Sequence, residues 1–258
     1  MASEGSKPVR IGLLGRGTVG AAFADLLAER AEAVEAATGR RPELSGVLTR
    51  AEGDFDSILA GSDLVVELMG GTDPAREHVL AALRAGKPVV TANKQLLAQH
   101  GDELFAVARE AGVQLRFEAA VAAVIPIVRA IQEGFGVTEI SKVFGIVNGT
   151  TNFILTEMAA SGAGYDDVLA RAQELGYAEA DPSDDVNGAD AAAKMAILSS
   201  IAFHARVLID DVPHEGIDLL QAEDLGHARS LGFVVKLLGV ARLMNGSVSV
   251  RVYPALVP

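Results

Sequence analysis

The segment VRIGLLGRGTVG, Val9–Gly20, joins a short apolar run to a cluster of glycines. The run Val9–Leu14 predicts a buried strand, and the alanine-rich segment Ala21–Ala33 has the periodicity of a helix. The glycines between them follow the spacing G-x-G-x-x-G. In this motif the first glycine allows a tight turn, the second lets the backbone approach a pyrophosphate, and the third lets the helix pack on the strand. Because free N–H groups at a helix start favour phosphate, we expect a dinucleotide at Gly15, Arg16, Gly17, Thr18, Val19 and Gly20.

Strands and helices alternate in the residues that follow this segment. Apolar runs predict strands at Glu43–Thr49, Asp63–Met69, Pro88–Thr91 and Val113–Phe117. One helix is expected after Asp73, which would cap it with Pro74 at its first position, and another at Asp102–Ala111. This alternation predicts a Rossmann-like parallel α/β sheet, whose ligands bind beyond the carboxyl ends of the strands. The candidate residues at those ends are Gly70, Thr91, Asn93, Lys94 and Glu118.

The end of the second predicted strand bears on the choice of dinucleotide. In folds that select NAD, an acidic residue near this point binds the ribose 2′-hydroxyl. Here the strand ends in Thr49-Arg50. An arginine suits a 2′-phosphate, so the sequence favours NADP over NAD; the alternative is that Arg50 is a surface residue without this role.

The second half of the chain has a different order of elements. Helices are expected at Ile125–Glu133, Thr151–Ala160 and Asp166–Leu175, and a strand at Ile140–Val147. Two further strands, Val234–Leu243 and Val248–Leu256, flank Asn245-Gly246, which is a strong signal for a β-hairpin. The pattern predicts an α+β domain. We therefore expect a loose tail at residues 1–8, a nucleotide-binding domain at 9–136 and a second domain at 137–258.

Gly176–Leu198 contains five carboxylates followed by one cation, Lys194. The carboxylates are those of Glu179, Asp181, Asp184, Asp185 and Asp190. A helical pattern begins at Ala189, so Asp190 and Lys194 are four residues apart on one helix face. One interpretation is an exposed ion pair without a catalytic role, which would contribute about 0.3–0.5 kcal/mol to stability. The alternative is a site in which the lysine does chemistry.

Composition excludes several classes of protein. The chain has 258 residues, a formal net charge of −12 and no basic run, which argues against nucleic acid and anionic membranes as partners. It has no cysteine, so disulfides and cysteine nucleophiles are excluded. No apolar run is long enough to span a bilayer, and residues 1–8 are polar, without the apolar region of a signal peptide. We therefore expect a cytoplasmic protein with a small-molecule substrate.

With these residues in view, the chain resembles the homoserine dehydrogenase family from Val9 to Pro258. The resemblance rests on GRGTVG, VVTANK, EAAV…IP, GIVNGTTNFIL and GYAEADPSDDVNGADAAAK. It implies a Rossmann-like domain followed by an α+β catalytic and dimerisation domain. It also implies NAD(P)-dependent interconversion of L-homoserine and L-aspartate 4-semialdehyde in the biosynthesis of threonine, methionine and isoleucine, carried out by a homodimer.

The resemblance implies roles for individual residues. Lys194 would be the catalytic acid/base, Asp190 its helper, and Lys94 a lysine between cofactor and substrate. Glu179 would bind the substrate ammonium. Further substrate contacts are implied at Tyr177, Asp185, Gly149 and Thr150. A monovalent cation such as sodium is implied at the backbone of Glu118, Val121, Ala123 and Ile125.

Two departures from the family pattern leave alternatives open. Family members commonly have a glycine in the segment that here reads Ala122-Ala123-Val124. Family chains also continue beyond Pro258, so the C-terminal part of the catalytic domain is expected to be missing. One alternative is a catalytically impaired NADP-binding or dimerisation module, and another is a reductase of a different amino-acid-like carbonyl. The lack of cysteine argues against phosphorylating semialdehyde dehydrogenases, which work through a thiohemiacetal.

Overall fold

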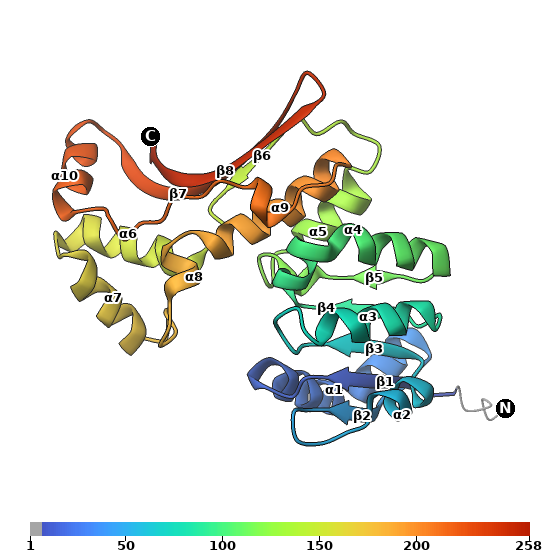
Figure 1. The fold of residues 1–258 in the computed structure, drawn as a ribbon. Coiled ribbons are helices and arrows are strands. Elements are labelled where there is room, and N and C mark those ends of the chain that lie inside the picture. Colours follow the sequence, from blue (N-terminus) through green and yellow to red (C-terminus); the bar gives the residue numbers. More distant parts are fainter. Residues whose placement is uncertain (1–6) are drawn as a thin grey trace. The chain divides into compact units, whose positions relative to one another are not determined.

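The computed structural model describes residues 7–258, which form two compact units. The first ends at Ala123, and the second runs Val124–Pro258 (Figure 1). The limits expected from the sequence, 9–136 and 137–258, assign Val124–Gly136 to the first domain instead. The contacts assign this segment to the second unit because its π-helix η2 (Ala130–Gly134) packs on helix α9 (Ala189–Phe203).

The first unit is built on a five-stranded parallel sheet with the order β2-β1-β3-β4-β5. The strands are β1 (Val9–Leu14), β2 (Pro42–Leu48), β3 (Leu64–Glu67), β4 (Val89–Thr91) and β5 (Leu115–Arg116). The connecting helices are α1 (Thr18–Thr38), α2 (Phe55–Gly61), α3 (Ala75–Arg84) and α4 (Lys94–Ala111), and η1 (Glu118–Ala120) follows β5. Ile11, Leu13 and Val66 form a buried cluster with Ala24 of α1, so this helix covers the sheet. The predicted parallel sheet is confirmed.

Two helices of this unit begin differently from the prediction. The α4 helix starts at Lys94 rather than at Asp102, because the Asn93 side chain accepts a hydrogen bond from the Leu96 N–H at 3.0 Å and caps it. The prediction that Asp73 caps α3 is wrong: the capping position is Pro74, and no side chain caps the helix. The α4 start places Lys94 at the carboxyl edge of the sheet.

The second unit is α+β, as predicted. A three-stranded antiparallel sheet has the order β6-β7-β8, with strands β6 (Lys142–Gly145), β7 (Val234–Met244) and β8 (Ser247–Val257). Asn245 and Gly246 both have positive φ, 51° and 78°, as a type I′ hairpin requires. The other helices are α5 (Ile127–Arg129), α6 (Gly149–Ser161), α7 (Tyr165–Glu174), α8 (Ser183–Val186), η3 (Ile209–Asp211) and α10 (Ala222–Ser230). The helix expected at Ile125–Glu133 is the short α5 continued by η2.

Helix α9 forms the centre of the second unit. Ten of its fifteen residues are buried, and Met195 lies directly over Gly239 of β7, where a β-carbon would come within 2.5 Å of its sulfur.

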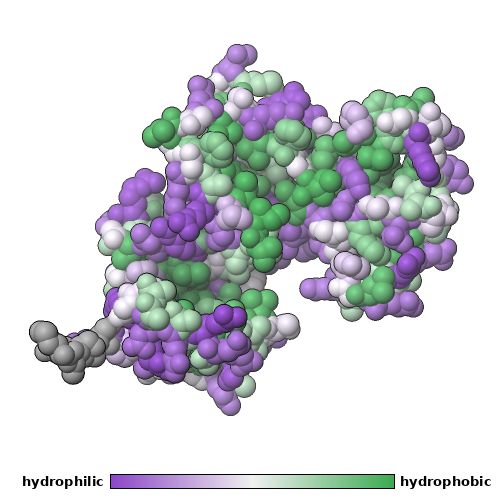
Figure 2. All heavy atoms as spheres, turned by 180° about the vertical axis from the view of Figure 1, so that it is seen from behind, coloured by the Kyte–Doolittle hydropathy of each residue, from purple (hydrophilic) through white to green (hydrophobic). Residues whose placement is uncertain are grey.

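Figure 2 shows hydrophobic residues interrupting the hydrophilic surface on one face of the molecule. The exposed hydrophobic residues of the antiparallel sheet include Phe144, Val234, Met244 and Leu256. Among residues 7–258, none of the helices combines the length and apolar character needed to cross a bilayer.

Candidate active site

The glycine-rich turn has the geometry that its spacing predicts. Gly15 has a φ of 93°, and a β-carbon on it would lie 2.6 Å from the Leu68 carbonyl oxygen. A β-carbon on Gly20 would lie 2.1 Å from the Gly15 carbonyl oxygen, so only glycine lets α1 approach the turn. Beside Gly17, by contrast, nothing lies within 4 Å. The open side of Gly17, at the start of α1, is the space that a pyrophosphate needs.

Arg50 lies at the same edge of the sheet as this turn. The Gly15 N–H donates to the Leu48 carbonyl oxygen, the last residue of β2, at 2.9 Å. Arg50 follows two residues later and is exposed. The Thr49 hydroxyl oxygen accepts from the Glu52 N–H at 3.0 Å and tightens the turn that carries it. The arginine is thus exposed just beyond the carboxyl end of β2.

A buried carboxylate that the sequence analysis missed organises the next strand ends. Glu67, the last residue of β3, is completely buried. Its carboxylate accepts from the Met69 N–H at 2.8 Å, the Thr91 hydroxyl at 2.5 Å and the Asn93 amide at 3.3 Å. The Asn93 amide also donates to the Gly71 carbonyl oxygen at 2.6 Å. The predicted residues Thr91 and Asn93 are therefore held together by an acid whose only sequence signal was its place at the end of an apolar run.

The Asp190–Lys194 pair of α9 is largely buried, so the interpretation as an exposed ion pair is wrong. The Lys194 ammonium donates to the Asp190 carboxylate at 2.6 Å and to the Val147 carbonyl oxygen at 3.0 Å. Only 2% of the Asp190 side chain and 18% of the Lys194 side chain are exposed. An ammonium has three N–H groups. Val147 and Asp190 hold two of them, and Lys194 also lines a cavity.

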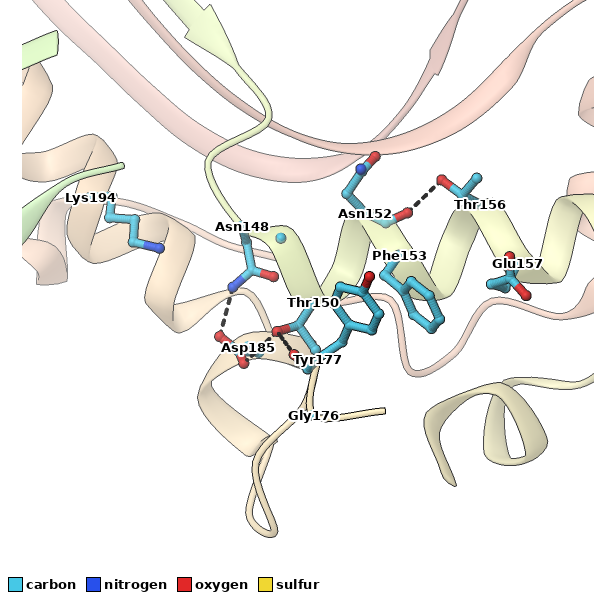
Figure 3. Close-up of a pocket in the computed structure, with 11 residues that line it drawn as sticks. Asn148, Thr150, Asn152, Phe153, Thr156, Glu157, Gly176, Tyr177, Asp185 and Lys194 are labelled. Atoms are coloured by element: carbon cyan, nitrogen blue, oxygen red, sulfur yellow. Dashed lines mark hydrogen bonds between the residues drawn. The ribbon is translucent and has the colours of Figure 1, made fainter. Parts of the chain in front are cut away.

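Asn148 connects this pair to the acidic segment, and the sequence analysis did not assign it to the site. Its amide nitrogen donates to Asp190 at 2.9 Å. The same nitrogen donates to Asp185 at 2.7 Å, the bond that Figure 3 shows. The second oxygen of Asp185 accepts from the Thr150 hydroxyl at 3.0 Å. The predicted residues Asp185, Asp190, Lys194 and Thr150 thus lie in one hydrogen-bonded cluster.

This cluster borders a cavity of about 530 Å³. Of the predicted residues, Gly149, Thr150, Tyr177, Asp185 and Lys194 line it. The sequence analysis did not assign its other lining residues, which are Asn148, Asn152, Phe153, Thr156, Glu157 and Gly176. Figure 3 shows the rings of Phe153 and Tyr177 side by side; they stack with centroids 4.4 Å apart. Glu179 is exposed between α7 and α8 and is not among the lining residues of this cavity.

Lys236 of β7 fixes the far wall of the cavity. Its ammonium donates to the side-chain oxygens of Asn152 and Thr156, both at 2.8 Å. Burial lowers the pKa of Lys236 below its ordinary value. The sequence could not assign this role, because β7 and α6 are far apart in the chain.

The residues expected to bind a cation lie on both sides of the unit boundary. Glu118, Val121 and Ala123 belong to the first unit and Ile125 to the second. Ala122 and Ala123 have φ values of 60° and 46°, in the left-handed region that favours glycine. The departure from the family's glycine therefore coincides with a strained turn.

Two family models match the chain. The model for homoserine dehydrogenase matches residues 126–258, and the model for the homoserine dehydrogenase NAD-binding domain matches residues 15–118. The chain belongs to the homoserine dehydrogenase family. The resemblance deduced from the motifs and the expected NAD(P)-binding domain are thereby confirmed.

Relatives support the same assignment. A homoserine dehydrogenase of Pseudomonas aeruginosa is 46% identical over 266 aligned residues, which cover 98% of this chain and 61% of that protein. The crystal structure of a homoserine dehydrogenase from Thiobacillus denitrificans has a TM-score of 0.92 and 44% identity, covering 97% of this chain and 62% of that one. A hyperthermophilic archaeal homoserine dehydrogenase in complex with NADPH has a TM-score of 0.78 and 27% identity, with 98% and 83% covered. The chain thus spans about three fifths of the length of the first two relatives.

Proposed function

We propose that this chain reduces L-aspartate 4-semialdehyde to L-homoserine with NADPH, and catalyses the reverse reaction. The observation that carries the proposal is the Lys194 ammonium, held by Asp190 and Val147 at the wall of a cavity. Family membership supports the activity. The proposal concerns the chain as given, which spans 61% of the length of the Pseudomonas relative.

Lys194 has the chemistry that reduction of an aldehyde needs at the oxygen. With two N–H groups held, the third is available to a carbonyl oxygen in the cavity. The lysine then either transfers this proton as negative charge develops on the oxygen or stabilises the charge as a fixed cation. Asp190 keeps the ammonium in place in both cases, because its carboxylate is buried and directly bonded to it.

The cavity suits an amino acid. Asp185 lines it with one carboxylate, and a carboxylate forms charge-assisted hydrogen bonds with a substrate ammonium. The N–H groups of Gly149 and Thr150 lie at the start of α6, where negative charge is favoured. The role of Glu179 in binding the substrate ammonium stays a prediction, because Glu179 is not among the residues that line this cavity.

The first unit fits a dinucleotide. Gly15, Gly17 and Gly20 provide the turn, the open space and the close helix approach described above. When bound, NADPH supplies the hydride for the substrate carbonyl carbon. Gly70, Thr91, Asn93 and Lys94 lie at strand ends or directly after them, where such a ligand binds. Arg50 supports NADP over NAD, because a guanidinium pairs with a 2′-phosphate.

Three parts of the proposal go beyond the reaction itself. A homodimer through the second unit is supported by the exposed hydrophobic residues of its sheet, such as Phe144 and Met244. The cytoplasm is the proposed location. A monovalent cation at Glu118, Val121, Ala123 and Ile125 stays a prediction.

The test is oxidation of NADPH by the purified chain with L-aspartate 4-semialdehyde, followed by absorbance. We expect turnover that Lys194→Met reduces by about 10²–10⁴-fold while NADPH still binds. Arg50→Asp should raise the KM for NADPH more than that for NADH. Binding of NADPH without turnover would refute the enzyme and support the alternative of a binding module. Turnover of other amino-acid-like aldehydes in preference to this one would favour a different reductase.

A further inference from the structure

The Asn148 side chain uses all of its hydrogen-bonding groups inside the protein. This residue follows β6, caps α6 and is 4% exposed. Its oxygen accepts from the Thr151 N–H at 2.8 Å and the Thr151 hydroxyl at 2.9 Å. Its nitrogen donates one hydrogen to Asp185 and the other to Asp190. An amide turned the other way would oppose its oxygen to two carboxylates, so the orientation follows from the partners.

This amide nitrogen joins two carboxylates that would otherwise repel each other. Asp185 comes from α8 and Asp190 from α9, and both accept from the same atom, at 2.7 and 2.9 Å. The same Asp190 oxygen also accepts from Lys194 at 2.6 Å. Val147, the neighbour of Asn148, accepts the other held hydrogen of the ammonium. Two consecutive residues therefore fix both members of the ion pair.

We infer that Asn148 is a positioning residue that sets the direction of the Lys194 ammonium by holding Asp190 and Asp185 together through its amide nitrogen. It acts through these carboxylates, because no hydrogen of its amide is left for a substrate. The inference rests on the proposed function only where Lys194 acts on the carbonyl oxygen. Capping of α6 alone would need the oxygen of Asn148 and not its nitrogen.

The substitution that separates the two roles is Asn148→Asp. It keeps the capping oxygen and the size of the side chain but replaces the bridging nitrogen by an oxygen that faces two carboxylates. The matched control is Asn187→Asp. Asn187 is exposed, and its side-chain oxygen accepts from the Ala189 N–H at 2.8 Å near the start of α9, so the control adds the same charge and also keeps a capping bond.

Turnover is the first readout. We expect Asn148→Asp to lower kcat at least tenfold, with the KM for NADPH unchanged, and Asn187→Asp to stay within about twofold of the unsubstituted chain. The charged groups facing the amide are Asp185 from α8 and Asp190 and Lys194 from α9. A third carboxylate among them should move the acid limb of the kcat profile to higher pH. A kcat within twofold and an unmoved profile would overturn the inference.

The second readout needs no turnover. NMR of the Lys194 side-chain nitrogen, assigned by its loss in Lys194→Met, reports the surroundings of the ammonium. Asn148→Asp should displace this resonance, because the carboxylates that hold the ammonium lose their shared donor, and Asn187→Asp should leave it in place.

If the unsubstituted chain shows no turnover, the proposed function fails, and the Lys194 resonance alone decides the role of Asn148. If Asn148→Asp does not fold, Asn148→Ser takes its place, since serine caps a helix and adds no charge. In that case we expect the same loss of kcat and a displaced Lys194 resonance. An unaltered resonance with normal kcat would refute the positioning role.

Discussion

The buried Asp190–Lys194 pair should contribute far more stability than its helical spacing suggests. Lys194→Met removes the ammonium and leaves an almost fully buried carboxylate without its cationic partner. Breaking a fully buried pair costs about 3–5 kcal/mol, and since 18% of the lysine is exposed we expect about 2–4 kcal/mol. Asp190→Asn should cost about 1–3 kcal/mol, because Lys194 keeps its bond to Val147.

A double-mutant cycle isolates the pair from these separate losses. The double variant should lose less free energy of unfolding than the sum of the single variants, with a coupling of about 1–3 kcal/mol. The measurement is urea unfolding followed by circular dichroism. If the two units unfold separately, the cycle applies to the transition that both single substitutions shift. This experiment requires no enzymatic activity.

The chain contains a matched pair for comparison. Arg129 and Glu133 have the same i, i+4 spacing and a 2.8 Å ion pair, but 71% and 46% of their side chains are exposed. The cycle of Arg129→Met and Glu133→Gln should give a coupling of about 0.3–0.5 kcal/mol. The argument from burial would be refuted if the two pairs gave equal coupling free energies. It would also be refuted if the coupling free energy of Asp190 and Lys194 were below about 0.5 kcal/mol.

Three further predictions concern other parts of the chain. Gly17→Ala should raise the Kd for NADPH at least tenfold with little change in Tm, because its β-carbon meets no protein atom within 4 Å and would occupy the space of the pyrophosphate; unchanged affinity would argue against that placement. Ala123→Gly should raise the free energy of unfolding by about 0.5–1 kcal/mol, because the strain of an alanine at positive φ exceeds the conformational entropy that glycine loses on folding. Ala108→Gly inside α4 is the control, and it should lower the free energy of unfolding by about 1 kcal/mol. Asp63→Asn should cost about 0.5–1 kcal/mol at neutral pH, a value reduced for solvent exposure. Arg10 lowers the pKa of Asp63 to about 2, so its contribution is present above the unfolded pKa near 4 and is lost as the pH falls towards 2. The difference from the unsubstituted chain in urea unfolding should therefore close between those pH values.

The sequence predicted what depends on local order. The spacing of Gly15, Gly17 and Gly20 indicates a strand, a turn and a helix start, because the motif lies within one short stretch of chain and Gly20 packs on the backbone of Gly15. It could not indicate the role of Glu67. That acid lies inside an apolar run, and its partners Thr91 and Asn93 reach it only when β4 pairs with β3. A buried carboxylate at a strand end is recognised by its donors, and these lie 24 and 26 residues further along the chain.

The same distinction between local sequence and distant contacts applies to Asp190 and Lys194, whose spacing can be predicted but whose chemistry cannot. Spacing alone places Asp190 and Lys194 on one helix face, and an exposed pair with that spacing would be free to move in water. What converts this pair into a fixed ammonium is the junction of β6 and α6, where Val147 holds the lysine and Asn148 holds the aspartate. Those contacts span 47 and 42 residues of sequence. The chemistry of Lys194 therefore depends as much on a backbone carbonyl and an amide from another element as on the carboxylate one turn away.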